Sequence, residues 1–516
     1  MNAQELLQEI SDYCRQTGLA ESTFGRRAVN DGKLASRLRH GGRITTETLD
    51  RIRTFMATNR SVAARPSVIA RPQDRATDQA PQASVGSAIP TAPTPSAAPV
   101  APSAPRPFMP MMSPASQPMT STIPSVTPPS ITLPPASGGP DPQRNFRFFD
   151  NRQKYLLFVN TCSEKWVVAN RVSQELANVH PRPPALRLFD AGVGDGTVLL
   201  RVMRSMHDRF PHTPFYVVGK EISLEDVRLA MQKMSDRFTE HPATVLVLTN
   251  LAYADAPWLA VKSLSAASSM VWREVALTGS SAHHFEQQIT DLVPFLNENW
   301  KAGVSPKTGN PVYERPVVLV VYREDHKFLL DPILPKPGGA RADYDLVIAS
   351  QPYRARASLD FKAKRVVAPL ARSLGPGGRL IAIHSHGNDP GHEIIQRVWP
   401  GDNPFIHDRH QIMKAVKHEL GVAGRDLNFN AYADNRALFR YDMHTLPGEI
   451  THESSIGTST LFAAWNAAIY VSQVEDHRVA EAAADGRYLE ATKEVLQKHG
   501  ALWFFDESYV ISRRRE

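Results

Sequence analysis

The chain contains little cysteine. Its 516 residues include two cysteines, Cys14 and Cys162, which lie far apart in the sequence. A pair of distant thiols supplies neither a disulfide framework nor the thiolate set of a structural zinc site. We therefore expect a protein of a reducing compartment, and we predict no metal centre.

Long apolar runs are also missing. No segment approaches the roughly 20 consecutive apolar residues that a membrane-spanning helix requires. The first residues include acids and lack the apolar segment of a secretory signal. These absences argue against an integral membrane protein and against a secreted one. We expect a cytoplasmic protein with no membrane partner.

Proline is abundant but unevenly placed. We count 20 of the chain's 41 prolines between residues 61 and 142, in a stretch rich in Ala, Ser and Thr with few charged or aromatic residues. Such a composition cannot bury enough apolar surface to offset the entropy of ordering the chain. We predict a disordered linker over 61–145, which separates a domain at 1–60 from a larger one at 146–516.

The segment before the linker has the pattern of a small helical domain. Apolar residues recur at helical spacing in 3–17, and shorter helices are expected over 21–29, 31–40 and 45–56. Two short helices joined by the tight turn Val-Asn-Asp-Gly resemble the helix-turn-helix of phage-repressor-like DNA-binding domains. The resemblance implies that the helix at 31–40 contacts DNA.

Polar and basic residues on and just beyond that third helix are the candidate DNA contacts, because such side chains bind phosphates and base edges. The candidates are Lys33, Ser36, Arg37, Arg39 and Arg43. The first 60 residues hold ten Lys and Arg against seven Asp and Glu, and the whole chain has a formal net charge of +7. This charge permits association with nucleic acid without requiring it. A helical module that binds protein, or a solvated basic face, stays an alternative.

The most informative stretch is LRLFDAGVGDGTVLL at residues 186–200. An apolar run ends at Asp190, three glycines follow at alternate positions, and a helical pattern begins at Thr197. This arrangement brings bare backbone close to a ligand, because glycine has no Cβ and a helix N-terminus offers free N–H groups. In a doubly wound α/β domain, nucleotide-like cofactors bind at this first loop.

The glycine spacing distinguishes between cofactors. A dinucleotide-binding turn spaces its glycines G-x-G-x-x-G, whereas this chain has D-x-G-x-G-x-G. The latter pattern resembles motif I of the class I S-adenosylmethionine-dependent methyltransferases. The resemblance implies a doubly wound, Rossmann-like α/β fold with S-adenosyl-L-methionine as cofactor. Its methionine part would rest on Asp190, Gly192, Gly194 and Gly196.

The flanking segments agree with this resemblance. A β-branched and aromatic run at 215–223 contains Glu221, and a carboxylate at a strand end can accept hydrogen bonds from both ribose hydroxyls. A third strand is expected at 243–248. The resemblance implies that the loop after it contacts adenine, which makes Asn250 and Asp255 candidates. Glycines that only form turns, and a solvated Glu221, are the structural alternatives.

A fourth element concerns the methyl acceptor. Residues 344–353 read YDLVIASQPY, a buried strand that ends in Ser350, Gln351, Pro352 and Tyr353. These four residues resemble motif IV of the amine-directed methyltransferases, [N/D/S]-x-P-[Y/F/W]. The resemblance implies that Ser350 and nearby carbonyls accept hydrogen bonds from a target amine, and that Tyr353 stacks on a planar substrate. A strand end followed by a proline turn is the alternative.

Other parts of the large domain are predicted more coarsely. A glycine-rich turn precedes a fifth strand at 379–383, and we expect the histidine-rich loop at 384–393 to lie near the active site. A helical segment at 155–177 is a candidate lid over the cofactor. A helix is expected at about 479–499, followed by closing strands from Trp503 onwards.

Two insertions interrupt the methyltransferase pattern. The first, about 85 residues at 256–340, is predicted to form a cap, with a helix at 282–300 and strands at 316–322 and 326–330. The second, 399–448, is rich in His, Asp, Asn and aromatic residues and contains the sequence NFNAY. No role is assigned to it from the sequence.

Together these features predict a methyltransferase that acts on an amine nitrogen. A nucleic-acid base is the leading acceptor, flipped out of its stack and brought close by the N-terminal domain. Two alternatives stay open. The acceptor is a protein or a small molecule, or the chain is a non-catalytic DNA-binding regulator that senses the cofactor.

Overall fold

The structure is a computed structural model that describes residues 3–17, 19–29, 31, 33–39, 46–60, 152–305, 311–445, 448–450 and 456–515. The chain divides into two compact units, one within residues 1–127 and one within 128–516. The predicted linker at 61–145 lies outside the described residues. No helix in the described part of the chain is long and apolar enough to cross a membrane.

The first unit is a small helical domain, as the sequence predicts. Its helices are α1 (Ala3–Thr17), α2 (Glu21–Val29), α3 (Leu34–Arg39) and α4 (Thr46–Arg60). Each amphipathic helix turns its apolar face toward one core, whose largest members are Tyr13 and Phe24. The two rings meet edge to face, with centroids 5.5 Å apart.

The second unit is built on a large mixed sheet. Ten strands of the described chain form it: β1 (Leu186–Asp190), β2 (Phe215–Lys220), β3 (Thr244–Thr249), β4 (Val271–Leu277), β7 (Val317–Arg323), β8 (Tyr344–Ser350), β9 (Leu374–Ser385), β10 (Leu427–Asn430), β11 (Leu438–Asp442) and β12 (Trp503–Arg513). The central strands are buried on both faces, which explains their continuous Val, Leu and Ile runs. The α/β prediction is confirmed.

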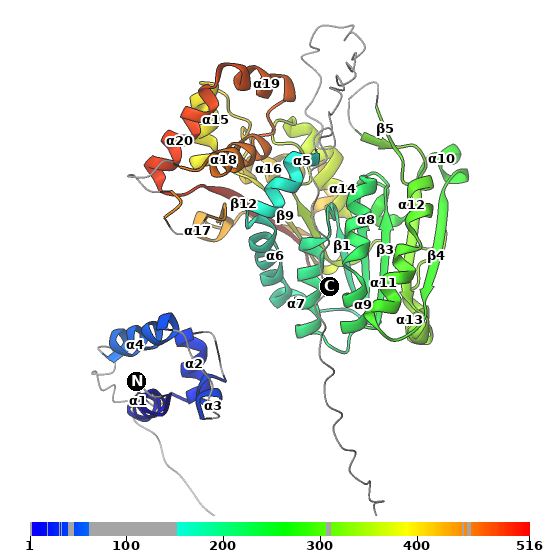
Figure 1. Ribbon diagram of the computed structural model, residues 1–516. Helices are drawn as coiled ribbons and strands as arrows, with labels where there is room; N and C mark the ends of the chain where they lie inside the picture. Colours follow the sequence, from blue (N-terminus) through cyan, green and yellow to red (C-terminus); the bar gives the residue numbers. More distant parts are fainter. Residues whose placement is uncertain are drawn as a thin grey trace, which may run out of the picture. The chain divides into compact units, whose positions relative to one another are not determined.

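The strand order is β10-β12-β9-β8-β1-β2-β3-β7-β4, with β11 paired to β12 (Figure 1). β1, β2, β3, β8 and β9 are parallel, whereas β12 and β7 are antiparallel to their neighbours β9 and β3. The chain order reverses between β1 and β8. In open α/β sheets, ligands bind at such a switch point, beyond the carboxyl ends of the strands.

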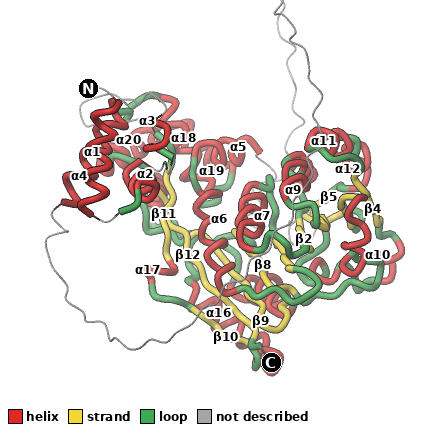
Figure 2. The backbone as a smooth tube through the Cα atoms, turned by 90° about the horizontal axis from the view of Figure 1, so that it is seen from below, coloured by secondary structure: helices red, strands yellow, loops and turns green. Residues whose placement is uncertain are grey.

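Helices cover both faces of the sheet. One face packs against α6 (Glu164–Glu175), α7 (Thr197–Arg209), α8 (Leu224–Gln232), α9 (Ser235–Glu240), α11 (Ala282–Thr290) and α12 (Val293–Asn299). The other packs against α13 (Lys327–Leu330), a π-helix (Phe361–Val367), α14 (Ala368–Arg372) and α16 (Arg409–Leu420). Figure 2 shows β10 and β12 beside α16 and α17 (Asp434–Ala437).

A further helical lobe has its own apolar cluster. It consists of α5 (Arg152–Thr161), α15 (Pro390–Val398), α18 (Thr458–Val471), α19 (Asp476–Asp485) and α20 (Arg487–His499). In Figure 1 this lobe lies beside β12 and β9. The predicted lid at 155–177 is therefore two helices, of which α5 belongs to the lobe and α6 to the sheet face.

Both predicted insertions add strands to the central sheet. β7 pairs with β3 and β4 pairs with β7, so 256–340 widens the sheet and does not form a separate cap. Within it, β5 (Ala302–Val304) and β6 (Pro311–Tyr313) form a separate hairpin, and α10 (Leu264–Ser268) precedes β4. The insertion at 399–448 likewise supplies β10 and β11, both of which pair with β12.

Three local predictions differ from the structure. The segment 326–330 is helical and not a strand: α13 lies between two short 3-10 turns, the second of which contains Pro332 at its start. The helix expected at 479–499 is two helices, α19 and α20, broken at Gly486, which has a φ of 72°. The closing strands after Trp503 are one long strand, β12.

Candidate functional site

The three glycines of the loop after β1 have different structural roles. Gly196 has a φ of 82°, and a Cβ there would stand 2.8 Å from the Cα of Ala230, so helix packing requires glycine. Gly194 also has a positive φ, of 54°. Gly192 is exposed and does not have a positive φ, and a Cβ there would meet only the Ser350 carbonyl oxygen, at 3.9 Å. The protein's own packing therefore leaves the space above Gly192 open.

Two buried carboxylates flank this open space. Asp190 is 1 % exposed and accepts a hydrogen bond from the Gly192 N–H, at 3.1 Å. Burial raises the pKa of Asp190 to about 7. Glu221 accepts hydrogen bonds from the backbone N–H groups of Gly194, Ile222 and Ser223, at 2.8 to 2.9 Å. Burial, and after it the charge of Asp226, raise the pKa of Glu221.

Helices α5 and α6 and the C-terminal end of α8 bring further polar groups to the loop. The Tyr155 hydroxyl lies 3.3 Å from both the Asp195 carboxylate and the Asp195 backbone N–H. Lys233 forms an ion pair with Asp195 at 2.6 Å. Lys165 lies 3.3 Å from Glu164, and it also acts electrostatically on Asp190 and Asp195. The loop therefore faces carboxylates together with an ammonium group.

The loop after β3 is close to the same carboxylates. Its Tyr253 donates a hydrogen bond to the Pro352 carbonyl, at 2.8 Å, and Lys220 lies 4.9 Å from the centre of its ring. Burial, and after it the charges of Glu221 and Asp190, raise the Tyr253 pKa. Tyr253 thus joins the cofactor-side loops to the proline turn after β8. The sequence analysis did not single it out.

The two candidates of this loop differ in their surroundings. The Asn250 amide donates to the Arg315 carbonyl and accepts from the Val317 N–H, both at 2.8 Å, so its side chain anchors the start of β7. Asp255 is half-buried, and burial raises its pKa. A contact of either residue with adenine stays a prediction.

The residues after β8 surround a strained position. Gln351 has a φ of 48°, which a side chain other than glycine rarely adopts. Its amide nitrogen donates to Asp506 and to Ser385, each at 3.2 Å, and its amide oxygen accepts from the Ser385 N–H. Strain of this kind is held only where the surroundings impose it, and it is common at functional sites.

Tyr353, the candidate stacking residue, is largely buried. It is 7 % exposed, and its ring lies in the core cluster on the α16 face of the sheet. Its hydroxyl donates to His384 Nδ1 at 3.0 Å, and His384 Nε2 donates to Glu507 at 2.8 Å, because a carboxylate can only accept. The structure thus gives Tyr353 hydrogen-bond partners within the protein, and a stacking contact with a planar substrate stays a prediction.

Glu507 is a strongly bound carboxylate. Burial raises its pKa, but the hydrogen bonds from His384, His386 and Arg409 outweigh this effect and hold the pKa well below its ordinary value. Burial lowers the pKa of His384, which is therefore a neutral imidazole at neutral pH. The histidine-rich loop thus joins a buried network.

Asp506, the neighbour of Glu507 in β12, points to the opposite face of the sheet. It is fully buried, and its Oδ2 atom has no hydrogen-bond partner among the described residues. Burial, and after it the charge of Glu164, raise its pKa well above the ordinary value. The sequence signal was available, because two successive acids inside an otherwise apolar strand pattern place one carboxyl on each face. Lys165 and Glu164 carried no comparable signal.

In the first unit, the candidate DNA contacts lie on and beside α3. Leu34, Ala35 and Leu38 are buried, whereas Lys33, Ser36 and Arg39 are exposed. Arg39 forms an ion pair with Glu21 of α2. Arg43 and the side chain of Arg37 lie outside the described residues.

Comparisons with known proteins add little to this geometry. No protein-family model matches the chain, and no curated protein matches it. Among the solved structures that overlap with it are two of a geranyl diphosphate methyltransferase, one in complex with GPP and sinefungin and the other with SAM. They are 12 % and 13 % identical, cover 67 % of this chain and 78 % and 85 % of their own, and have TM-scores of 0.26 and 0.25. At these TM-scores the overlap establishes neither a family nor a substrate.

Proposed function

We propose that the chain is an S-adenosyl-L-methionine-dependent methyltransferase that modifies an amine nitrogen. The observation that carries the proposal is the open space above Gly192, bounded by Asp190, Glu221 and the Ser350 carbonyl at the switch point of the sheet. A glycine that neither packing nor conformation requires leaves room for a ligand.

The chemistry of the surrounding groups fits this cofactor better than a dinucleotide. A pyrophosphate needs cations and free N–H groups, whereas Asp190, Glu221 and Asp195 present carboxylates. Carboxylates suit a positively charged sulfonium and an ammonium group, and Lys165 suits the carboxylate of an amino acid. With three N–H donors on its two oxygens, Glu221 keeps about one acceptor position for a ribose hydroxyl.

When bound, the cofactor supplies a methyl group on a positively charged sulfur, so the reaction needs no nucleophilic side chain. The protein has to orient the acceptor and receive its proton. The Ser350 carbonyl lies across from Gly192 and is positioned to accept an N–H bond from the acceptor. Asp506 is fully buried and so does not meet the acceptor itself, but it accepts a hydrogen bond from Gln351, and we propose that it positions Gln351 beside the acceptor.

Calorimetric titration of the full chain with S-adenosylmethionine and S-adenosylhomocysteine tests the cofactor. We expect micromolar affinity, weakened at least about tenfold, or ~1.4 kcal/mol, in Asp190→Ala and in Glu221→Ala. Glu225→Ala, which removes a nearby exposed acid on α8, is the matched control and should bind normally. Absence of binding in a folded protein would overturn the cofactor assignment.

A methyl-transfer screen with labelled cofactor then tests the acceptor, across single-stranded DNA, RNA, protein fractions and small amines. We expect label on nitrogen, and we expect Asp506→Asn to lower turnover at least about tenfold while cofactor affinity stays within about twofold. Label on oxygen or carbon would contradict the amine assignment. An equal loss of affinity and turnover in Asp506→Asn would make the residue structural.

We also propose that residues 1–60 bind DNA through the exposed side of α3. The support is the separation of buried Leu34 and Leu38 on α3 from exposed Arg39 at its end and exposed Lys33 just before it. A gel-shift assay should show weaker duplex binding by Lys33→Ala with Arg39→Ala than by wild type, with a smaller salt slope. Unchanged binding would favour a protein-interaction module.

A further inference from the structure

A second polar pocket lies along the edge strand β10, away from the carboxylates described above. It encloses about 680 Å³. Its lining comes from β10, β12, β9 and the segments next to them: Asn178, Arg379, Lys417, Leu427, Asn428, Phe429, Asn430, Tyr432, Arg436, Ser512 and Arg514. The NFNAY sequence, to which no role was assigned, supplies four of these residues.

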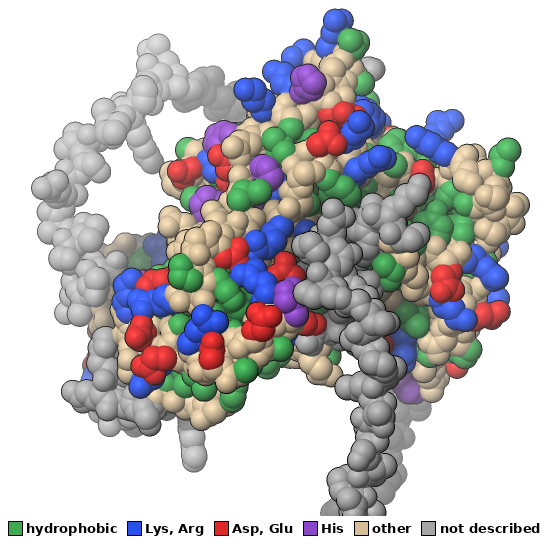
Figure 3. All heavy atoms as spheres, turned by 90° about the horizontal axis from the view of Figure 1, so that it is seen from above, with side chains coloured by type: hydrophobic (Ala, Val, Ile, Leu, Met, Phe, Trp, Pro, Cys, Tyr) green, Lys and Arg blue, Asp and Glu red, His purple; other side chains and the backbone are tan. Residues whose placement is uncertain are grey.

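The side chains that line the pocket are basic or uncharged. None of the described residues that line it is Asp or Glu. Arg379 is neutralised by Glu175, to which it donates two hydrogen bonds at 2.7 and 2.9 Å. No described carboxylate forms an ion pair with Lys417, Arg436 or Arg514, and all three side chains are exposed. On the face shown in Figure 3, by contrast, basic and acidic side chains are interspersed.

An aromatic ring is held at one end of the pocket. The Tyr432 hydroxyl lies 3.3 Å from Arg379, and the Arg436 guanidinium lies over its ring, 3.9 Å from the centre. The Tyr432 backbone has a φ of 39°, and Arg409 binds its carbonyl oxygen at 3.2 Å. The surroundings therefore impose a strained conformation that presents a planar, positively charged stack to solvent.

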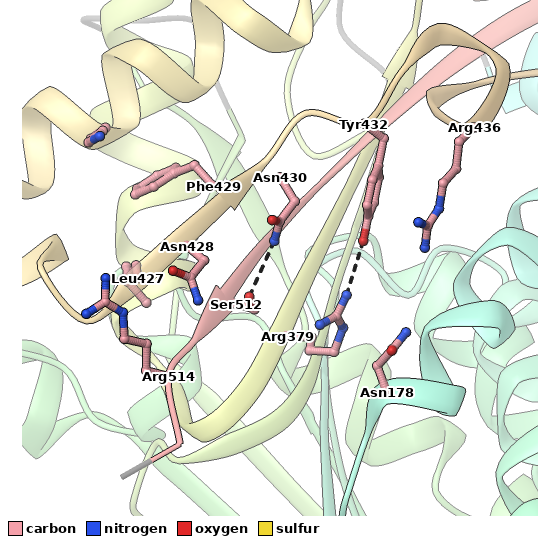
Figure 4. Close-up of a pocket in the computed structure, with 11 residues that line it drawn as sticks. Asn178, Arg379, Leu427, Asn428, Phe429, Asn430, Tyr432, Arg436, Ser512 and Arg514 are labelled. Atoms are coloured by element: carbon pink, nitrogen blue, oxygen red, sulfur yellow. Dashed lines mark hydrogen bonds between the residues drawn. The ribbon is translucent and has the colours of Figure 1, made fainter.

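Amide and hydroxyl groups line the wall of the pocket between the basic side chains. Asn430 donates to Ser512 at 3.4 Å, and Asn428 is exposed on the same face of β10. In Figure 4, Arg514 and Arg436 mark the two ends of a row that contains Asn428, Asn430 and Tyr432. From Asn428 to Asn430 the strand part of this row is about 7 Å long, since a strand rises roughly 3.3 Å per residue, and Tyr432 and Arg436 extend the row beyond the strand. The row is too long for one phosphate group.

We propose that this pocket binds a short stretch of single-stranded nucleic acid. Phosphates lie at Lys417 and Arg514, and one base stacks on the outer face of the Arg436 guanidinium. Cations that follow a backbone, together with a stacking platform for bases, are the two elements of single-strand binding without sequence preference. Guanidinium planes serve as such platforms. The inference does not depend on methyl transfer.

The test uses the full chain, a fluorescein-labelled 12-nucleotide single strand and anisotropy at several salt concentrations. Replacing Lys417, Arg436 and Arg514 together by Ala should weaken binding at least about tenfold and lower the salt slope by about 1.4, at roughly 0.7 for each of the two phosphate contacts. The matched control replaces the exposed Lys262, Lys301 and Lys336 of the other sheet edge and removes equal charge. Control binding should stay within about threefold of wild type.

Ultraviolet cross-linking places the strand even if the first unit also binds nucleic acid. We expect cross-linked peptides that contain Phe429 or Tyr432, and we expect them to vanish in the triple variant. Arg436→Lys keeps the charge but loses the planar stack, so it should lose severalfold in affinity. Cross-links confined to other segments, or equal losses in the triple and control variants, would overturn the proposal. Adenosine monophosphate binding as tightly as the 12-mer would make the pocket a nucleotide site and would overturn the strand assignment.

Discussion

The two ends of the same strands carry opposite charge. β12 begins beside Asp506 and Glu507 and ends beside Ser512 and Arg514. β9, its antiparallel partner, contributes Ser385 to the acidic end and Arg379 to the basic one. The acidic end lies at the switch point of the sheet, and the basic end lies along the exposed edge strand β10.

This difference teaches that one sheet can serve ligands of opposite charge without conflict. Ser512 follows Asp506 by six positions in β12, which is about 20 Å along an extended strand. The Debye length at physiological salt is only about 8 Å. At this distance salt screens the solvent-exposed cations of the basic end, so each end should respond to its own substitutions. The predictions below test that independence.

The largest expected effect comes from filling the open space at the acidic end. Gly192→Leu should weaken S-adenosylmethionine binding about a hundredfold, or ~2.7 kcal/mol, because its side chain enters the space that the protein leaves empty. Its melting temperature should stay close to that of wild type. Gly196→Ala is the contrasting variant. Its positive φ costs ~1–2 kcal/mol for a residue with a Cβ, and the contact with Ala230 adds to this, so its melting temperature should fall.

These two variants are measured by calorimetry and thermal unfolding. If Gly192→Leu unfolds as readily as Gly196→Ala, the space above Gly192 is part of the fold and not a ligand site. If Gly192→Leu binds the cofactor normally, the ligand lies elsewhere.

The next effect is that a substitution at one end should weaken the binding of one ligand and leave the binding of the other unchanged. Asp190→Ala should lose at least about tenfold in cofactor affinity and nothing in oligonucleotide affinity. The triple variant of Lys417, Arg436 and Arg514 should show the reverse. Both titrations are made on both proteins. A loss of both ligands in either variant would mean that the ends are coupled, and the chain from Tyr353 through His384, Glu507 and Arg409 to the Tyr432 carbonyl is the route to examine.

A smaller effect is expected in the pH dependence of cofactor affinity, which only the acidic end should show. Burial raises the pKa of Asp190 to about 7, so the group is mostly neutral at pH 5.5 and mostly ionised at pH 7.5. In the protein without ligand, the contribution of Asp190 to the free energy of unfolding falls as the pH rises from about 4 through 7. The reason is that the folded state binds the proton more tightly than the unfolded state. A cationic ligand favours the ionised form, so its affinity should rise about tenfold from pH 5.5 to 7.5.

Calorimetry at three pH values, in wild type and Asp190→Asn, measures this dependence. The asparagine variant should have a clearly smaller slope, with a remainder that belongs to Glu221. Identical slopes in the two proteins would show that Asp190 does not face the charge of the ligand. Oligonucleotide affinity at the basic end should not follow the same profile.

The smallest effect is expected for Tyr353→Phe. It keeps the buried ring and removes the hydroxyl that donates to His384, which should cost ~1 kcal/mol of stability. Cofactor affinity and oligonucleotide affinity should both stay within about twofold. Thermal unfolding and the two titrations check this. A loss of turnover far larger than the loss of stability would indicate that Tyr353 contacts the substrate directly.

Local patterns determined much of this protein. The apolar run before Asp190, the alternating glycines and the strand that ends at Ser350 predicted β1, the loop and β8 from period and turn chemistry alone. The first two helices of the first unit followed in the same way, whereas α3 is shorter than expected and α4 continues to Arg60. Such features depend on neighbours within a few residues, which the sequence presents directly.

Tertiary structure decided which strands pair and which side chains from distant parts of the sequence come into contact. Only the pairing of β7 with β3 turned an expected cap into an extension of the sheet, and only the fold of the turn after Pro352 buried Tyr353. The partners of Gln351 lie at residues 385 and 506, and the basic pocket draws on segments from residue 178 to residue 514. Charge at a site is a sum over residues distant in the sequence, whereas a strand or a turn is a property of consecutive ones. For this reason the loop could be predicted from the sequence, but the opposite charges of the two ends could not.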